Sequence, residues 1–269
     1  MQQIGLSLHL IGGKNINMKS IKTFIRAIAA VGLIAASVSC RHDDTLVYNN
    51  LTMGNIVDGT FVSDMGNIFN VTENPCYKDL GTMNRALVLC DVLNKVEGTD
   101  NEYDIRLNAA TEVLVKKPVT KVLADNDKDM ATEDPIDIPY LWISGGYINT
   151  YLMFEFKYDT QTSQKHLINL VYDQENSKDG KYEFILRHNA FGETASNEAA
   201  GLTFGGNYVS FPISDIIKED SAEIIIKCRW YKTISGGIMS DLQEKSFNIQ
   251  YIRGGFEHAP RAVISNTSF

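Results

Sequence analysis

Alternation of apolar and polar residues recurs along most of this 269-residue chain. It is clearest at Tyr103–Leu107 and at Tyr147–Tyr158, where the apolar side chains fall on one face. A repeat of two places side chains on alternate faces of a β-strand, whereas a helix needs a repeat near 3.6. No segment carries a helical repeat for more than about two turns. The sequence therefore predicts an all-β protein.

The first half of the chain body contains a compact group of short strands. Thr60–Ser63 and Asn67–Thr72 flank Asp64-Met-Gly66, which predicts a hairpin with glycine in its turn. Arg85–Leu93 is apolar on both faces and suits a strand that is covered on both sides. Further strands are predicted at Tyr103–Leu107 and Glu112–Val115. We expect these strands to form one small domain over residues 53–121.

A different composition begins at Val122. Residues 122–139 carry many carboxylates and two prolines without an apolar repeat, so we interpret them as an acidic interdomain linker or a long exposed loop. Short strands resume at Tyr140–Ile143, Tyr147–Tyr158, His166–Asp173, Tyr182–Asn189, Tyr208–Ile213, Ala222–Tyr231 and Lys245–Ile252. This spacing favours an antiparallel β-sandwich over residues 140–269.

A secretory signal precedes these domains. Lys19, Lys22 and Arg26 form a basic flank, an apolar core of about ten residues occupies 27–36, and small residues lead to Cys40. The core is too short to cross a bilayer of about 30 Å as a helix. A cysteine at this position is typical of a bacterial lipoprotein signal.

We therefore expect residues 1–39 to be the signal peptide, with Met18 the better start, and residues 40–52 to be a lipidated tether. Ser37 departs from the apolar residue usual three positions before a lipidated cysteine. An uncleaved anchor or a buried helix is the alternative interpretation.

Asp43 and Asp44 follow Cys40 closely. They resemble acidic export signals that send lipoproteins to the cell surface in one Gram-negative phylum. The alternative is an acidic tether with no role beyond solvation. On the first interpretation the protein is anchored in the outer membrane and faces the cell surface.

The charge of the chain limits its partners. Removal of residues 1–39 takes away four basic residues and no acidic one, so the formal charge of −8 becomes −12. A negative body disfavours nucleic acid and anionic lipid headgroups. We therefore expect no nucleic-acid partner and membrane attachment only through acyl chains on Cys40.

Three further cysteines remain. Cys90 and Cys228 alternate with apolar neighbours and are expected to be buried. Cys76 lies in a predicted loop. A disulfide between Cys76 and Cys90 is an alternative, because export to an oxidising compartment permits one.

Several motifs together resemble the NigD-like lipoproteins. In the first half these are Gly59-Thr60-Phe61, Arg85–Leu93 and Tyr103–Leu107; in the second half they are Tyr147-Ile-Asn149, His166–Val171 and Leu186–Ala190. The resemblance implies an N-terminal barrel of the OB type followed by a C-terminal β-sandwich. Members are largely of unassigned activity, so the resemblance implies no catalytic residues.

Motifs for chemistry are weak. Asp125-Asn-Asp-Lys-Asp129 begins like a calcium loop, but Met130 and Ile136 stand where that loop needs Gly and Glu. No histidine pair has zinc-ligand spacing, and no nucleophile elbow or phosphate loop appears in the sequence. We expect no metal, no cofactor and no enzymatic activity.

The ligand-binding candidates are mostly aromatic. Phe61 and Phe69 lie on the predicted hairpin, Trp142 and Tyr147 lie at the domain junction, and His188 ends a strong strand. The same alternation suits a core position for Phe61, Phe69 and Trp142, and a backbone-bonded core-edge position for His188.

We therefore expect a non-catalytic surface lipoprotein with a binding, accessory or immunity-type role and a protein or neutral glycan as ligand. One alternative is a periplasm-facing structural lipoprotein of the envelope. The other is a hydrolase of glycan or peptide, because catalytic groups can be distant in sequence.

Overall fold

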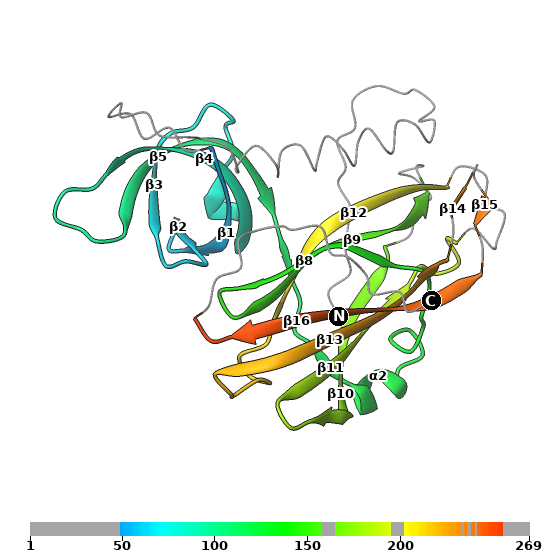
Figure 1. The fold of residues 1–269 in the computed structure, drawn as a ribbon. Coiled ribbons are helices and arrows are strands. Elements are labelled where there is room, and N and C mark those ends of the chain that lie inside the picture. The colour runs from blue at the N-terminus through cyan, green and yellow to red at the C-terminus, as the bar shows by residue number, and fades with distance from the viewer. Residues whose placement is uncertain are drawn as a thin grey trace.

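The computed structural model describes residues 49–157, 165–194, 202–232, 234–235, 238–239 and 241–254. Strands dominate these residues and form a closed barrel followed by two further main sheets (Figure 1). The predicted all-β class, with an OB-like barrel and then a β-sandwich, is confirmed. The predicted signal peptide, Cys40, Asp43 and Asp44 lie outside the described residues. In the described part of the chain, no helix is long and apolar enough to span a membrane.

The barrel is built from five strands: β1 (Asn49–Val57), β2 (Thr60–Ser63), β3 (Ile68–Glu73), β4 (Arg85–Lys95) and β5 (Glu102–Glu112). They close in the order β1-β2-β3-β5-β4, and β4 pairs back to β1. The β3–β5 pair is parallel and the other pairs are antiparallel. Phe61, Val88, Ile105 and Leu107 fill the interior. A short 3-10 helix, η2 (Leu80–Thr82), adds Leu80 to this core.

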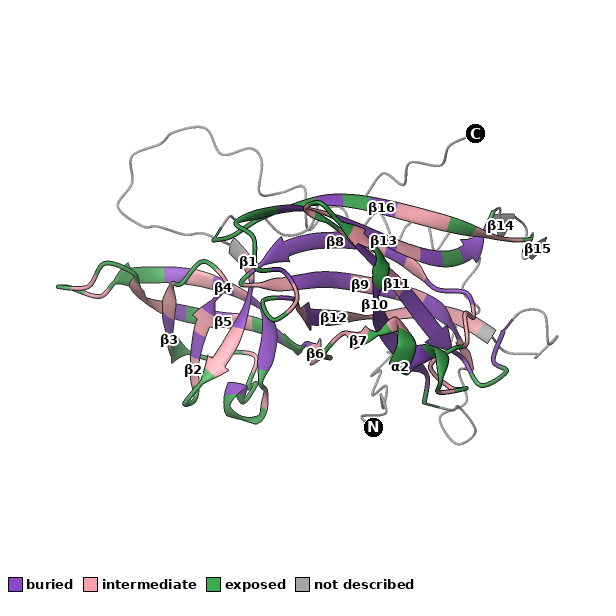
Figure 2. Cartoon of the chain, turned by 90° about the horizontal axis from the view of Figure 1, so that it is seen from below, coloured by how far each residue is buried: buried purple, intermediate pink, exposed green. Residues whose placement is uncertain are grey.

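The sandwich contains two main sheets. Their elements are β6 (Leu114–Val115), β7 (Val119–Thr120), β8 (Asp137–Ser144), β9 (Tyr147–Lys157), β10 (Leu167–Lys178), β11 (Lys181–Asn189), β12 (Leu202–Pro212), β13 (Ser221–Tyr231) and β16 (Leu242–Ile252). One sheet has the order β16-β13-β11-β10-β7 and the other β6-β12-β9-β8. Buried residues of both sheets form one apolar core, and Figure 2 shows long purple stretches along the strands that supply them. A small separate pair, β14 (Ile234–Ser235) and β15 (Ile238–Met239), follows β13.

The interpretation of residues 122–139 as a linker is wrong. Strands β6 and β7 already pair with the sandwich, and a short helix, α2 (Lys121–Asp125), follows them. Ile136 and Ile138 are fully buried in the sandwich core. The sandwich therefore begins near residue 114, directly after the barrel.

The acidic residues of this stretch have partners on the sandwich. Asp125 forms an ion pair of 2.7 Å with Arg187, and Asp137 forms one of 2.8 Å with Lys245. The Asp134 carboxylate accepts a hydrogen bond from the backbone N–H of Ala190 at 2.7 Å. These carboxylates thus bind specific donors of the sandwich rather than solvating a free segment. A stretch held by polar contacts needs no apolar repeat, so the missing repeat did not indicate a linker.

The predicted tether is also too long. Strand β1 begins at Asn49, which pairs with Asp91 of β4, so residues 49–52 belong to the barrel rather than to the tether. Met53 is buried, as are Leu87 and Val113, on the side of the barrel that faces the sandwich.

Arg85 joins the two domains. Its side chain is completely buried, and its guanidinium forms a bidentate ion pair with Asp64 at 2.8 and 2.6 Å. The three remaining N–H groups donate to Asn55 of the barrel and to Asn149 and Ser210 of the sandwich, at 2.9–3.0 Å. All five guanidinium donors are therefore satisfied, as burial of such a cation requires.

The sandwich closes around this ion pair with the β8–β9 hairpin. Ser144 donates a hydrogen bond of 2.5 Å to Asp64, and the Tyr147 ring lies 4.0 Å from the Arg85 guanidinium carbon. The two turn residues, Gly145 and Gly146, both have positive φ, as a tight hairpin of this kind requires. A Cβ at Gly145 would lie only 2.4 Å from the Asp64 carboxylate. The hairpin therefore fits the ion pair closely.

Loss of the Arg85 side chain should destabilise the protein strongly. Arg85→Met leaves the Asp64 carboxylate buried without its cation, which costs about 3–5 kcal/mol in the free energy of unfolding. Arg106→Met is the matched control, because its ion pair with Glu73 is about half exposed, and it should cost less than about 1 kcal/mol. Denaturant titration measures both. Adding Asp64→Asn to Arg85→Met should recover part of the lost stability, because the unpaired carboxylate is then removed. Equal stability of Arg85→Met and Arg106→Met would contradict the structural role of Arg85.

Candidate functional site

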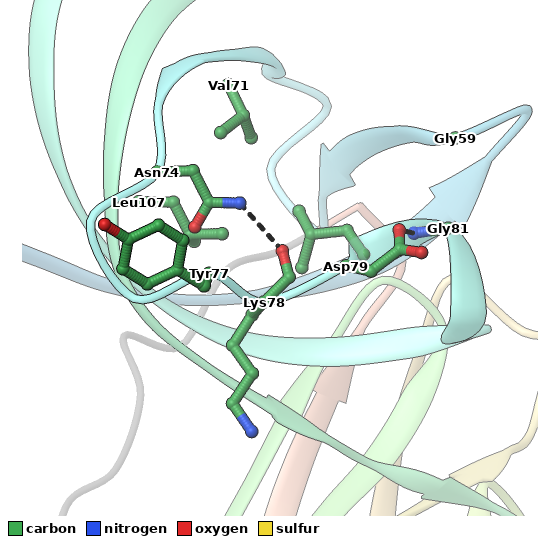
Figure 3. Close-up of a pocket in the computed structure, with 9 residues that line it drawn as sticks. Gly59, Val71, Asn74, Tyr77, Lys78, Asp79, Gly81 and Leu107 are labelled. Carbon is green, nitrogen blue, oxygen red and sulfur yellow. Dashed lines mark hydrogen bonds between the residues drawn. The ribbon is translucent and has the colours of Figure 1, made fainter.

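A cleft of about 490 Å³ lies at one end of the barrel. It is formed by the β1–β2 turn, the end of β3 and the loop 74–81 that leads into β4 (Figure 3). Its lining residues are Gly59, Val71, Asn74, Tyr77, Lys78, Asp79, Leu80, Gly81 and Leu107. The size falls in the usual range of small-ligand sites.

Tyr77 is the most prominent residue of this cleft. Its side chain is 91% exposed, and its backbone has φ of 53°, in the left-handed region. Figure 3 shows its ring at the rim of the cleft, beside Asn74. A bulky residue in this conformation is rare, because its Cβ crowds the neighbouring backbone.

The loop holds Tyr77 in this conformation by local hydrogen bonds. The Tyr77 N–H donates to the Asn74 carbonyl at 3.2 Å, and the Asn74 side-chain amide donates to the Lys78 carbonyl at 2.9 Å. Pro75 is second in this turn, where its fixed φ is suitable. On the other side, the Asp79 carboxylate caps η2 by accepting from Gly81 N–H at 2.9 Å. Asn74 thus fixes the backbone on both sides of Tyr77.

A second cleft, of about 420 Å³, lies at the domain junction. It is bounded by the β2–β3 turn, the β8–β9 turn and the end of β16. Its charged groups are already paired, since Asp64 binds Arg85 and Arg253 binds Asp220 at 2.9 Å. The barrel-end cleft is therefore the stronger candidate for a binding site.

The predicted ligand-binding residues do not meet in either cleft. Phe61 and Phe69 stack in the barrel core, with ring centroids 5.8 Å apart. Trp142 is buried between the domains, and Tyr147 lies against the Arg85 guanidinium. His188 is also buried. Packing inside the protein thus accounts for the positions of these side chains. For Phe61, Phe69, Trp142 and His188 this agrees with the core or core-edge position that the sequence offered as the alternative to ligand binding.

His188 and His166 form a buried hydrogen-bonded pair in the sandwich. His188 Nδ1 lies 2.9 Å from the Pro135 carbonyl, and His188 Nε2 lies 2.9 Å from His166 Nδ1. Because a carbonyl only accepts, His188 Nδ1 carries the hydrogen and Nε2 accepts from His166. His166 Nε2 in turn lies 3.2 Å from Glu193.

Burial determines the ionisation of these histidines. Loss of hydration lowers the pKa of His188 to about 3, and the neighbouring His166 contributes to the same shift. Burial also lowers the pKa of His166, against an opposing effect from the Glu193 carboxylate. The pair lies under the Phe154 ring. Nothing in this arrangement presents a base to solvent.

The remaining cysteines fit their predicted environments. Cys90 and Cys228 are buried, as predicted, and Cys76 is half-buried; all three are free thiols. Burial, with a smaller contribution from Asp91, raises the pKa of the Cys90 thiol to about 12. These two buried thiols are therefore unreactive packing groups.

The acidic stretch does not form a calcium loop in the structure. Asp125 is paired with Lys121 and Arg187, which hold its pKa below the ordinary value. The Asp127 carboxylate accepts from the backbone N–H of Asp129 at 2.9 Å. Across the described ranges, no three metal-ligating side chains gather into a cluster.

Comparison with known proteins identifies the second domain. Residues 118–249 match the family model of the NigD-like C-terminal β-sandwich domain. This part of the chain is a NigD-like domain. The match starts at the strand β7 that precedes the acidic stretch, which agrees with the assignment of that stretch to the sandwich.

Solved structures share the two-domain fold. A protein of unknown function from Bacteroides vulgatus is 22% identical, with a TM-score of 0.56 over 75% of this chain and 90% of that one. A NigD-like immunity protein from Bacteroides caccae is 16% identical, with a TM-score of 0.51 over 78% and 99% of the two chains. A candidate lipoprotein from Bacteroides fragilis is 16% identical, with a TM-score of 0.54 over 76% and 98%. No curated protein matches the chain.

The NigD-like domain should lose stability in mild acid because of its histidine pair. The pKa of His188 is near 6.5 in the unfolded chain and about 3 in the fold, so below pH 6.5 the unfolded state binds more protons. The contribution of neutral His188 to the free energy of unfolding is therefore fully present above pH 6.5 and is lost as pH falls toward 3. His188→Gln should lower the melting temperature at pH 7.5 but reduce its further decrease between pH 7.5 and 5.

Leu186→Val is the matched control for this prediction. Leu186 is a core residue of the same strand, β11, and its shortening lowers stability while keeping both histidines. Thermal melting at several pH values should give this control the wild-type pH dependence. If the His188→Gln variant retained that dependence as well, the assigned cause would be incorrect.

Proposed function

We propose that this chain is a lipid-anchored protein of the bacterial outer membrane that binds a partner at the cell surface without catalysing a reaction. The signal that ends at Cys40 supports the anchor, and Asp43 and Asp44 support surface export. The fold shared with a candidate lipoprotein and with a NigD-like immunity protein is consistent with a role in the envelope.

One observation carries the binding role. Tyr77 is exposed and held in a left-handed backbone conformation at the rim of the barrel-end cleft. Folding favours neither property, since exposure leaves the ring unburied and the conformation favours glycine or asparagine. Strained residues of this kind concentrate at functional sites. We therefore assign the binding role to the barrel-end cleft.

The binding role predicts that Tyr77 is needed for attachment to a partner and not for folding. Tyr77→Asn should reduce saturable binding of the labelled mature protein to outer-membrane and surface material at least tenfold, without lowering the melting temperature. Val122→Asn removes an exposed apolar side chain on α2, far from the cleft, and serves as the matched control. Equal binding by Tyr77→Asn and wild type would contradict the role of the cleft.

The anchor and its orientation are tested separately. Cys40→Ala should leave the precursor unprocessed or release the protein from the membrane, because no acylated residue remains. Asp43→Ala with Asp44→Ala should keep lipidation but reduce antibody staining of intact cells at constant total protein. Membrane fractionation and staining measure the two effects. Unchanged staining would indicate that the acidic pair only solvates the tether and would favour a periplasm-facing protein.

A further inference from the structure

The surroundings of Tyr77 restrict the chemistry of its ligand. The exposed Val71 gives the cleft its apolar part above the fully buried Leu107, while Gly59 and Gly81 leave backbone without side-chain cover. The polar side chains that remain are Asn74 and Asp79, because Lys78 points away from the other lining residues (Figure 3). The cleft therefore combines one aromatic ring, a small apolar wall and oxygen acceptors.

We propose that this cleft binds a neutral glycan, an inference that rests on the proposed binding function and names its ligand class. The C–H groups on one face of a sugar ring carry partial positive charge and fit the electron-rich face of the Tyr77 ring. Sugar hydroxyls donate to the Asp79 carboxylate, which uses one oxygen to cap η2. The volume of about 490 Å³ accommodates a small ligand of this type.

The preorganised loop strengthens this assignment. A stacking platform gains affinity when its backbone needs no ordering on binding. The Asn74 hydrogen bonds fix the Tyr77 backbone before any ligand arrives, and Pro75 restricts the same turn. A single ring on a fixed backbone with polar groups beside it suits a sugar, whose faces are apolar and whose edges are hydroxylated.

Other ligand classes fit the cleft less well. A protein partner needs a wide apolar centre with several anchor residues. Among the described residues, Val71 is the one other large exposed apolar side chain that lines this cleft, while Met65, the Val122–Leu123 pair and Ile252 lie on other elements. An anionic glycan or a nucleic acid would meet Asp79 with no inward-pointing cation, on a mature chain of formal charge −12. A neutral ligand avoids this repulsion.

The experiment uses the purified lipidated protein in a detergent without a sugar headgroup. Binding to an array of neutral oligosaccharides is measured first, and the tightest one is titrated by calorimetry at 50 and 300 mM salt. Wild type should bind with little salt dependence. Tyr77→Asn should weaken binding at least tenfold with no decrease in melting temperature, while Tyr77→Phe should stay within about threefold, because it keeps the ring.

Each other result overturns the inference in a recognisable way. Binding no tighter than millimolar to every neutral oligosaccharide would exclude the glycan, and the envelope-binding assay of Tyr77→Asn would then decide whether the proposed function stands. Equal binding by wild type and Tyr77→Asn would place a glycan elsewhere on the protein. Preferential, salt-sensitive binding of polygalacturonate would contradict the neutral ligand.

Discussion

The buried ion pair between Arg85 and Asp64 of the barrel lies at the junction of the two domains, where residues of the sandwich complete its hydrogen bonds. Removing a guanidinium and a carboxylate from water costs several kcal/mol for each ion, and only complete hydrogen bonding offsets that cost. The planar guanidinium has five donors, and each has an acceptor here. A lysine would offer three donors in a different geometry and could not reproduce the arrangement. Both ions belong to the barrel, and Asn149, Ser210 and Ser144 of the sandwich complete their hydrogen bonds, so displacing the barrel would strip these partners from the ion pair.

Apolar contacts and backbone geometry extend this junction. Met53, Leu87 and Val113 of the barrel pack with Tyr140 and Trp142 of the sandwich. The domains are also joined directly, since β5 ends at Glu112 and β6 begins at Leu114. The acidic stretch is then free to pack on the sandwich, where Asp125 and Asp137 bind basic side chains. The absence of a linker is thus a consequence of the same close junction.

Much of the fold could be predicted from the sequence, because a β-strand is a local pattern. The repeat of two located β9, β11 and β13 to within a few residues, and the continuous apolar run located β4. The junction could not be found this way, since the Arg85 partners lie between 21 and 125 positions away along the chain. The acidic stretch was misjudged because two apolar residues, Ile136 and Ile138, were too few to show a repeat. Long-range pairing, rather than local propensity, decides both features.

The candidate site was missed for a related reason. Aromatic residues in strands, such as Phe61 and Phe69, drew attention although alternation also suited the core. Tyr77 lies in a loop with no periodicity, and its exposure and backbone conformation appear only in the structure. A weak signal was present in Asn74-Pro75, which favours a turn and places a tyrosine where glycine is usual.

The early start of β1 constrains how the proposed anchor and the cleft are arranged. Eight residues, 41–48, separate Cys40 from Asn49, and they can reach at most about 28 Å. β1 then runs the length of the barrel, and its far end leads through Val57 into the turn that contributes Gly59 to the cleft. The loop that carries Tyr77 follows β3, which runs in the same direction as β1 because both pair antiparallel with β2. The cleft therefore lies at the barrel end opposite the tether. On a lipidated protein this arrangement keeps the barrel near the membrane while leaving the Tyr77 ring accessible to ligands away from the attachment point.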